Sequence, residues 1–197
     1  GAGAVGVDVN GGGAADGDVR LRLGGLIHGG FGLRGLCDAS RPRRGCGAAA
    51  NFLDAGPNLR IVALADVFED RVTEARRLMK ERGQDIPDSR CYTGFDAFQK
   101  LIASDVDVVL HATPPHFRPM HMAAAVDARK HSFLEKPVAV DVPGVLAVMQ
   151  TAERATSQGL SIMTGTQLRR ELPRMEVQKR IRDGAIGDIR AVRALRN

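Results

Sequence analysis

The sequence predicts an α/β protein built on a doubly wound parallel sheet. Short apolar segments alternate with longer segments whose apolar residues recur with helical spacing. The apolar segments are hydrophobic on both faces, as strands are when helices cover both sides of a sheet. The connections between segments are short, which favours regular strand–helix crossovers.

The expected strands are, in chain order, residues 21–27, 60–66, 90–92, 106–112, 131–134 and 160–163. The expected helices are residues 48–55, 69–82, 96–104, 119–130 and 142–158. Gly83 and Gly159 follow two of these helices, at positions where glycine commonly ends a helix. Phe95, Phe98 and Leu101 are expected to point from the third helix into the core.

The chain divides into parts of different composition. Residues 1–18 are rich in glycine and alanine and are expected to form a flexible tail. Residues 19–164 are expected to form one domain, in which residues 33–46 are irregular because they lack both helical and strand periodicity. Residues 165–197 are expected to begin a second α/β domain that is incomplete in this chain. Its expected elements are a basic helix over 173–183, a turn over 184–187 and an opening strand over 188–195.

The formal charge of +5 and the pI near 9.6 fit either nucleic-acid binding or a basic surface beside an anionic cofactor. The arginines are scattered and no nucleic-acid motif occurs, so nucleic-acid binding is not expected. No apolar run reaches the roughly 18–20 residues of a membrane span and no signal peptide is recognisable, so a cytoplasmic protein is expected. The cysteines lack CxxC spacing and the histidines lack an HExxH pattern, which predicts neither disulfides nor a metal site.

Asp66 ends the second expected strand. In dinucleotide-binding sheets of this class, an acidic residue at that place binds the adenosine ribose hydroxyls. Gly47 precedes Asp66 at close to the roughly 20-residue spacing of that pattern. The alternative is an ordinary aspartate that caps the following helix.

Two glycine clusters compete for the turn at which a backbone can approach a pyrophosphate. Gly45 and Gly47 stand at a suitable distance from Asp66, but no apolar strand leads into them. Residues 28–32 (His-Gly-Gly-Phe-Gly) follow an expected strand but lie too far from Asp66. A third interpretation is that residues 1–46 are not genuine coding sequence.

Two further segments follow expected strands at the carboxyl edge, where sheets of this class bind ligands. Residues 112–116 (Ala-Thr-Pro-Pro-His) offer a hydroxyl, a stiff turn and an imidazole, unless they are simply a polar helix start. Lys136, in residues 135–137 (Glu-Lys-Pro), lies between apolar stretches and suits the proton exchange that accompanies hydride loss from an alcohol. A cis bond to Pro137 would fix its aim, and a plain surface lysine is the alternative.

Gln167 follows the last expected strand and is expected either on the substrate side or in a solvated cluster. Lys136 is the expected catalytic residue. The expected cofactor-binding residues are Gly45, Gly47, Asp66, Ala112, Thr113, Pro114, His116, Glu135, Lys136, Pro137 and Gln167.

From about Gly45 to Asn197 the chain resembles the Gfo/Idh/MocA oxidoreductases. The resemblance rests on residues 62–67 (Val-Ala-Leu-Ala-Asp-Val), 112–119 (Ala-Thr-Pro-Pro-His-Phe-Arg-Pro), 135–141 (Glu-Lys-Pro-Val-Ala-Val-Asp) and 183–187 (Asp-Gly-Ala-Ile-Gly). It implies an NAD(P)-binding Rossmann domain followed by an α/β domain with a large, mostly antiparallel sheet. It also implies hydride transfer between nicotinamide and a sugar, cyclitol or related hydroxyl, with Lys136 as the catalytic lysine. Asp66 favours NAD, because a carboxylate repels the additional phosphate of NADP.

Two departures from the family pattern leave other functions open. Residues 40–45 (Ser-Arg-Pro-Arg-Arg-Gly) stand where the family has a glycine-rich turn, and the chain ends before an Asp…His motif of the second domain. A non-catalytic dinucleotide-binding regulator and an inactive gene fragment are the alternatives to an enzyme. The expected partners are a small polyol or sugar substrate and, for the full-length protein, further copies of itself, with no nucleic acid and no membrane.

Overall fold

The structure, a computed structural model, describes residues 21–26, 44–166, 169 and 171–195. These residues belong to two compact units, one within residues 6–165 and the other within residues 166–197. The predicted tail, the glycine cluster at 28–32 and Gln167 lie outside the described residues.

The larger unit contains a six-stranded sheet in which the neighbouring strands pair in parallel. The strands are β1 Leu21–Leu26, β2 Leu59–Asp66, β3 Cys91–Thr93, β4 Val108–His111, β5 His131–Glu135 and β6 Ile162–Gly165. Their order across the sheet is β3-β2-β1-β4-β5-β6. The direction of winding therefore reverses between β1 and β4, and sheets of this class bind ligands beyond the carboxyl ends of the strands at such a point.

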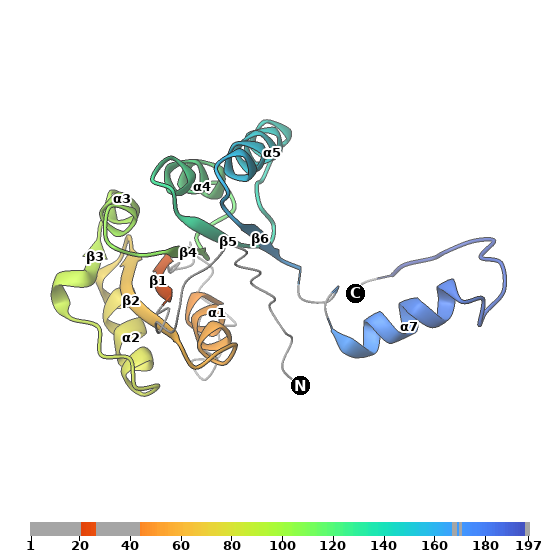
Figure 1. Cartoon of the computed structure of the whole chain (residues 1–197), viewed down its shortest axis with the longest axis horizontal. Coiled ribbons are helices and arrows are strands. Elements are labelled where there is room, and N and C mark those ends of the chain that lie inside the picture. The colour runs from red at the N-terminus through yellow and green to blue at the C-terminus, as the bar shows by residue number, and fades with distance from the viewer. Residues whose placement is uncertain (1–20, 27–43, 167–168, 170, 196–197) are drawn as a thin grey trace, which may run out of the picture. The chain divides into compact units, whose positions relative to one another are not determined.

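Helices cover both faces of this sheet, with α1 and α2 on one side and α3, α4 and α5 on the other (Figure 1). Their bounds are α1 Arg44–Leu53, α2 Glu69–Lys80, α3 Ala97–Ile102, α4 Arg118–Asp127 and α5 Val142–Ser157, and a short 3-10 helix η1 spans Asp88–Arg90. The doubly wound α/β fold predicted from the alternation of apolar segments is thus confirmed.

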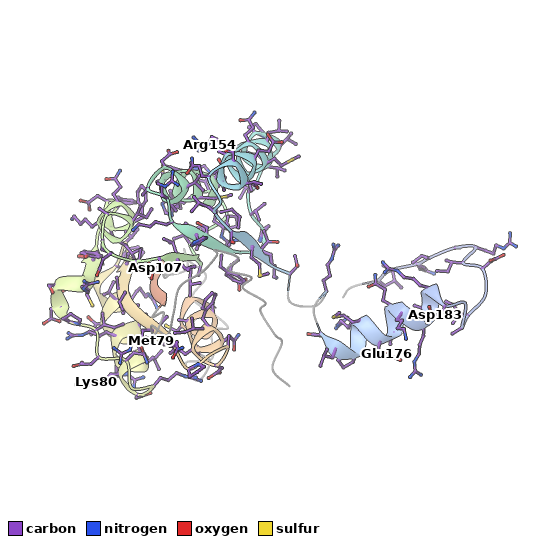
Figure 2. All side chains as sticks on the ribbon, viewed as in Figure 1. Met79, Lys80, Asp107, Arg154, Glu176 and Asp183 are labelled. Atoms are coloured by element: carbon purple, nitrogen blue, oxygen red, sulfur yellow. The ribbon has the colours of Figure 1, made fainter. Side chains whose placement is uncertain are left out.

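Each face of the sheet has its own hydrophobic core. The α1–α2 core consists of Cys46, Ala49, Phe52, Ile61, Leu64, Val72, Ala75, Met79, Ile86, Val108 and Leu110. The α3–α4 core consists of Ala63, Ala65, Ala97, Phe98, Leu101, Ile102, Val106, Val109 and Ala125. Met79 and Lys80, labelled in Figure 2, show how α2 divides between core and solvent, because Met79 is 2% exposed and its neighbour Lys80 is on the surface.

Two expectations about the elements of the larger unit were wrong. Phe95 does not face the core but is 79% exposed, because it precedes Asp96, the N-cap of α3, and so lies outside the helical periodicity. α1 begins at Arg44, inside the segment expected to be irregular. Its first turn contains Gly45 and Gly47, and glycine is a poor helix former, which explains why the pattern did not predict a helix there.

The described part of the smaller unit is one exposed helix, α7 Leu172–Arg182, followed by glycine turns. No residue of α7 is buried, and the side chains of Glu176 and Asp183 extend away from the ribbon (Figure 2). Residues 188–195 form no strand, so the expectation of an opening strand over these residues was also wrong. A strand needs a neighbour for its backbone hydrogen bonds, and alternating sequence alone does not provide one.

Among the described residues, none of the helices is long and apolar enough to span a bilayer.

Candidate functional site

The strand register brings the predicted site segments to one edge of the sheet. Leu26 pairs with Ala65 on one side and with His111 on the other, and His111 pairs in turn with Leu134. The residues that follow these partners are Asp66, Ala112 and Glu135. The ends of three strands therefore place the predicted segments side by side at the carboxyl edge.

Asp66 is a buried carboxylate at this edge. Its side chain is 5% exposed, and its Oδ1 accepts a hydrogen bond of 3.0 Å from the backbone N–H of Phe68. Phe68, and not Asp66, is the N-cap residue of α2, and α2 has no side-chain cap. The alternative interpretation of Asp66 as the helix cap is therefore wrong; its carboxylate instead closes a tight turn between β2 and α2.

Gly45 and Gly47 lie in the first turn of α1. Gly45 is buried, whereas a Cβ added to Gly47 would meet no atom of the described residues within 4 Å. This turn contains no acidic residue. At the start of α1, no described residue fills the space beside Gly47, and a helix start leaves its first N–H groups without helical partners.

The segment after β4 turns directly into α4. Ala112 and Thr113 are buried, Pro114 is half-buried and His116 is exposed, with its ring 5.2 Å from that of Phe117. The exposed imidazole is accessible to a ligand, whereas the Thr113 hydroxyl is engaged inside the protein. Its Oγ1 lies 3.4 Å from Nδ1 of His121 on α4.

His121 is enclosed by two aromatic rings. Its imidazole stacks on Phe98 with a centroid distance of 4.1 Å and on Phe117 with a distance of 5.9 Å. Burial lowers the pKa of His121 to about 4, so the ring is neutral at neutral pH. This neutral ring fixes the start of α4 against α3.

His111 ends β4 as a second buried imidazole. It is 1% exposed, and its Nε2 lies 3.1 Å from the hydroxyl oxygen of Ser132 on β5. Burial lowers the pKa of His111 to about 3, helped by repulsion from His121 once that ring is protonated and by the charge of Arg118. The pair joins the last residue of β4 to the second residue of β5 by a side-chain contact.

Lys136 follows the last residue of β5 and is exposed at the carboxyl edge. The bond between Lys136 and Pro137 is cis, the geometry that the sequence had suggested as one option. Arg118, at the first position of α4, donates hydrogen bonds to the carbonyl oxygens of Glu135 and Pro137. The lysine therefore stands between two backbone carbonyls that are held by the same buried arginine.

The predicted site residues include both exposed and buried positions, but they omit four buried polar side chains of this region. His111, Arg118, His121 and Ser132 were not among the predicted site residues. The one available signal was His111, which continues an apolar run on a central strand. Among the described residues, no cluster of three or more His, Cys, Asp or Glu side chains is suited to hold a metal ion.

A protein-family model matches most of the larger unit. The model of the Gfo/Idh/MocA oxidoreductases, described as an oxidoreductase family with an NAD-binding Rossmann fold, matches residues 45–163.

Curated relatives and solved structures agree with this match. A glycosyl hydrolase family 109 protein of Bacteroides fragilis is 31% identical over 113 residues, which are 56% of this chain and 24% of that protein. Scyllo-inositol dehydrogenase from Lactobacillus casei, solved with NAD(H) and scyllo-inositol, has a TM-score of 0.61 at 22% identity, over 85% of this chain and 42% of that one. A 3-ketoreductase from Actinomadura kijaniata, solved with TDP-benzene and NADP, has a TM-score of 0.61 at 24% identity, over 86% and 46% of the two chains. The chain thus spans about a quarter of that curated relative and under half of each solved chain.

Proposed function

This chain belongs to the Gfo/Idh/MocA family of NAD(P)-dependent oxidoreductases, and we propose that it binds NAD at the carboxyl edge of its sheet and contributes Lys136 to a hydride transfer. The observation that carries the proposal is the register that aligns the ends of β2, β4 and β5. It puts a buried carboxylate, a Thr-Pro-Pro-His turn and a lysine at the same edge.

The residues present fit a dinucleotide in two respects. Asp66 offers a carboxylate at the end of β2, where it would accept hydrogen bonds from the adenosine ribose hydroxyls. The first turn of α1 has no acidic side chain, and no described residue lies where a Cβ of Gly47 would be, as close approach of a pyrophosphate requires. Ala112, Pro114 and His116 would then lie towards the nicotinamide end, with Gln167 on the substrate side.

Lys136 acts as the proton acceptor in this proposal. A bound nicotinamide supplies the acceptor for the hydride. As a hydroxyl group is oxidised, Nζ of Lys136 takes its proton, and in the reverse direction Nζ returns it. Glu135 and Pro137 contribute the backbone that places the lysine.

The proposed substrate is a polyhydroxylated ring, a sugar or a cyclitol. Relatives by structure include an inositol dehydrogenase, and relatives by sequence include glycosyl hydrolase family 109 proteins. Both names point to ring compounds that carry several hydroxyl groups. We assign residues 165–197 to the start of a second domain that would complete the substrate side.

The choice of NAD over NADP rests on Asp66. Its negative charge would face the 2′-phosphate of NADP, and like charges at close range in a partly buried site repel strongly. The two solved relatives carry NAD(H) and NADP respectively, so the preference of this chain depends on its own residues.

Fluorescence titration with NADH and NADPH tests the proposal. The chain contains no tryptophan, so the emission of the cofactor itself is measured. We expect saturable NADH binding below about 1 mM, within the common range of enzyme affinities, and weaker NADPH binding. Asp66→Asn should weaken NADH binding by about tenfold or more, because a charge-assisted hydrogen bond is lost.

Asp107→Asn is the matched control, because Asp107 directly precedes β4 and so lies at the opposite, amino edge of the sheet. Its NADH affinity should equal that of the original chain. A folded chain that binds no NADH at millimolar concentration contradicts the proposal, and a preference for NADPH contradicts the NAD assignment. Reduction of NAD with a panel of polyols, abolished by Lys136→Ala, separates an enzyme from a non-catalytic dinucleotide-binding regulator.

A further inference from the structure

Arg118 is a buried cation at the start of α4. Its residue is 3% exposed, although arginine is seldom fully buried without partners. Nη1 donates to the carbonyl oxygen of Glu135 at 2.6 Å and also to the carbonyl oxygen of Pro137. The two acceptors flank Lys136, and one guanidinium thus holds the backbone before and after the lysine.

The held segment has no regular structure of its own. The ladder between β5 and β6 ends at the pair Glu135 and Gly165, and α5 begins only at Val142. At the far end, the side chain of Asp141 accepts a hydrogen bond of 2.8 Å from the N–H of Gly144 and caps α5. Residues 136–140 lie between these two anchors, and Arg118 adds a hydrogen-bonded support where the ladder stops.

The start of α4, where Arg118 lies, is itself held in place by aromatic stacking. Phe117 and His121, on either side of Arg118 in the chain, stack on each other, and His121 also stacks on Phe98 of α3. The planar guanidinium has its donors in a fixed arrangement, so it can satisfy two carbonyl groups at little cost in conformational freedom. A lysine ammonium at this position would keep the charge but not the fixed arrangement of donors.

We infer that Arg118 is a positioning residue for Lys136, which sets the place of the lysine through the carbonyl groups of Glu135 and Pro137. The inference rests on the proposed function of Lys136. Arg118 does not touch the reacting atoms; it joins the segment after β4 to the segment after β5. The two parts of the proposed site thereby keep a constant spacing.

Hydrogen–deuterium exchange tests the support without any need for catalysis. In Arg118→Gln, amide exchange of residues 136–141 should accelerate about tenfold or more, because charge-assisted hydrogen bonds to the segment are lost. Exchange in α2, residues 69–80, should stay unchanged. Arg154→Gln is the matched control, because Arg154 is a half-exposed arginine of α5 that pairs with Asp127 at 3.0 Å. If exchange of residues 136–141 is unaffected, or if α2 accelerates equally, the inference is wrong.

Kinetics then test the link to Lys136. With NAD and a polyol substrate, Arg118→Gln should lower kcat by about 10- to 100-fold with an unchanged Kd for NADH, since only the lysine is displaced. Arg118→Lys should fold and retain an intermediate kcat, and millimolar guanidinium should partly restore Arg118→Ala. Faster exchange with an unchanged kcat would overturn the positioning role. If the original chain shows no Lys136-dependent turnover, the proposed function fails, while the exchange experiment still decides whether Arg118 holds the segment.

Discussion

The two faces of the sheet are built for different tasks. The face that α1 and α2 cover is closed by hydrophobic side chains such as Phe52, Leu64 and Met79. The face that α3 and α4 cover has small residues, among them Ala63 and Ala65, and it also contains buried polar groups. These are His111, Thr113, Arg118, His121 and Ser132.

This difference shows where buried polar groups that position the strand ends replace hydrophobic side chains. A buried polar group contributes little to net stability, and it must be hydrogen-bonded to be tolerated. His111 contacts Ser132, His121 contacts Thr113, and Arg118 holds the segment of Lys136. We conclude that the α1–α2 face supplies stability, while the polar part of the other face supplies the placement of the strand ends.

The largest expected effect on stability comes from the α1–α2 core. Met79→Ala removes a side chain that is 2% exposed, and the free energy of unfolding should fall by about 2–5 kcal/mol, because a cavity is left behind. Urea denaturation measures this change. The neighbouring Lys80→Ala, on the exposed side of α2, is the control and should change it by less than about 0.5 kcal/mol.

Under native conditions the folded Met79→Ala chain should bind NADH with unchanged affinity, because Met79 supports the fold and not the strand ends. A large loss of affinity would contradict the separation of the two faces.

An effect of intermediate size is expected when the pH is lowered. Burial holds the pKa of His111 at about 3 and that of His121 at about 4, whereas both would titrate near 6.5 in the unfolded chain. Between the folded and the unfolded pKa values the unfolded state binds more protons than the folded state. The stability that the neutral histidines allow is therefore complete above pH 6.5 and decreases as the pH falls. From pH 7 to pH 5 the loss should be about 2 kcal/mol for each histidine.

Urea denaturation between pH 7.5 and pH 5 measures this dependence. His121→Phe keeps a ring between Phe98 and Phe117 but cannot take up a proton, so the slope should become about half as steep. His116→Gln, which changes an exposed imidazole, should keep the original slope. An identical slope in His121→Phe would show that His121 is not a neutral buried group in the folded chain.

The smallest expected effect comes from Phe95, an aromatic residue outside both cores. Because it is 79% exposed, Phe95→Ser should change the free energy of unfolding by less than about 0.5 kcal/mol. Phe98→Ser, three residues later in the α3–α4 core, is the informative comparison and should be strongly destabilising. Equal losses in the two variants would mean that Phe95 is part of the core.

The strands of the sheet could be predicted well because the apolar pattern of each strand lies within a few consecutive residues. The run around Val108 and Leu110 is apolar on both faces, and such a run predicts a buried strand wherever it occurs. Asp66 and Lys136 were predicted at strand ends for the same reason. Arg118 could not be predicted in this way, since its burial depends on carbonyl groups of a segment that is distant in sequence. A basic residue at the start of a helix is ordinarily expected to be exposed to solvent.

The position of β1 has a consequence for the order in which the chain folds. Leu26 pairs with Ala65 and also with His111, so β1 completes its pairing only after β4 is available. Pairings between residues far apart in sequence are entropically costly to form and slow the folding of a domain. During synthesis β1 could pair with β4 only after residues beyond the middle of the chain have left the ribosome. The same strand that marks the reversal of the sheet is therefore expected to join the two halves late, in a non-local and rate-limiting step.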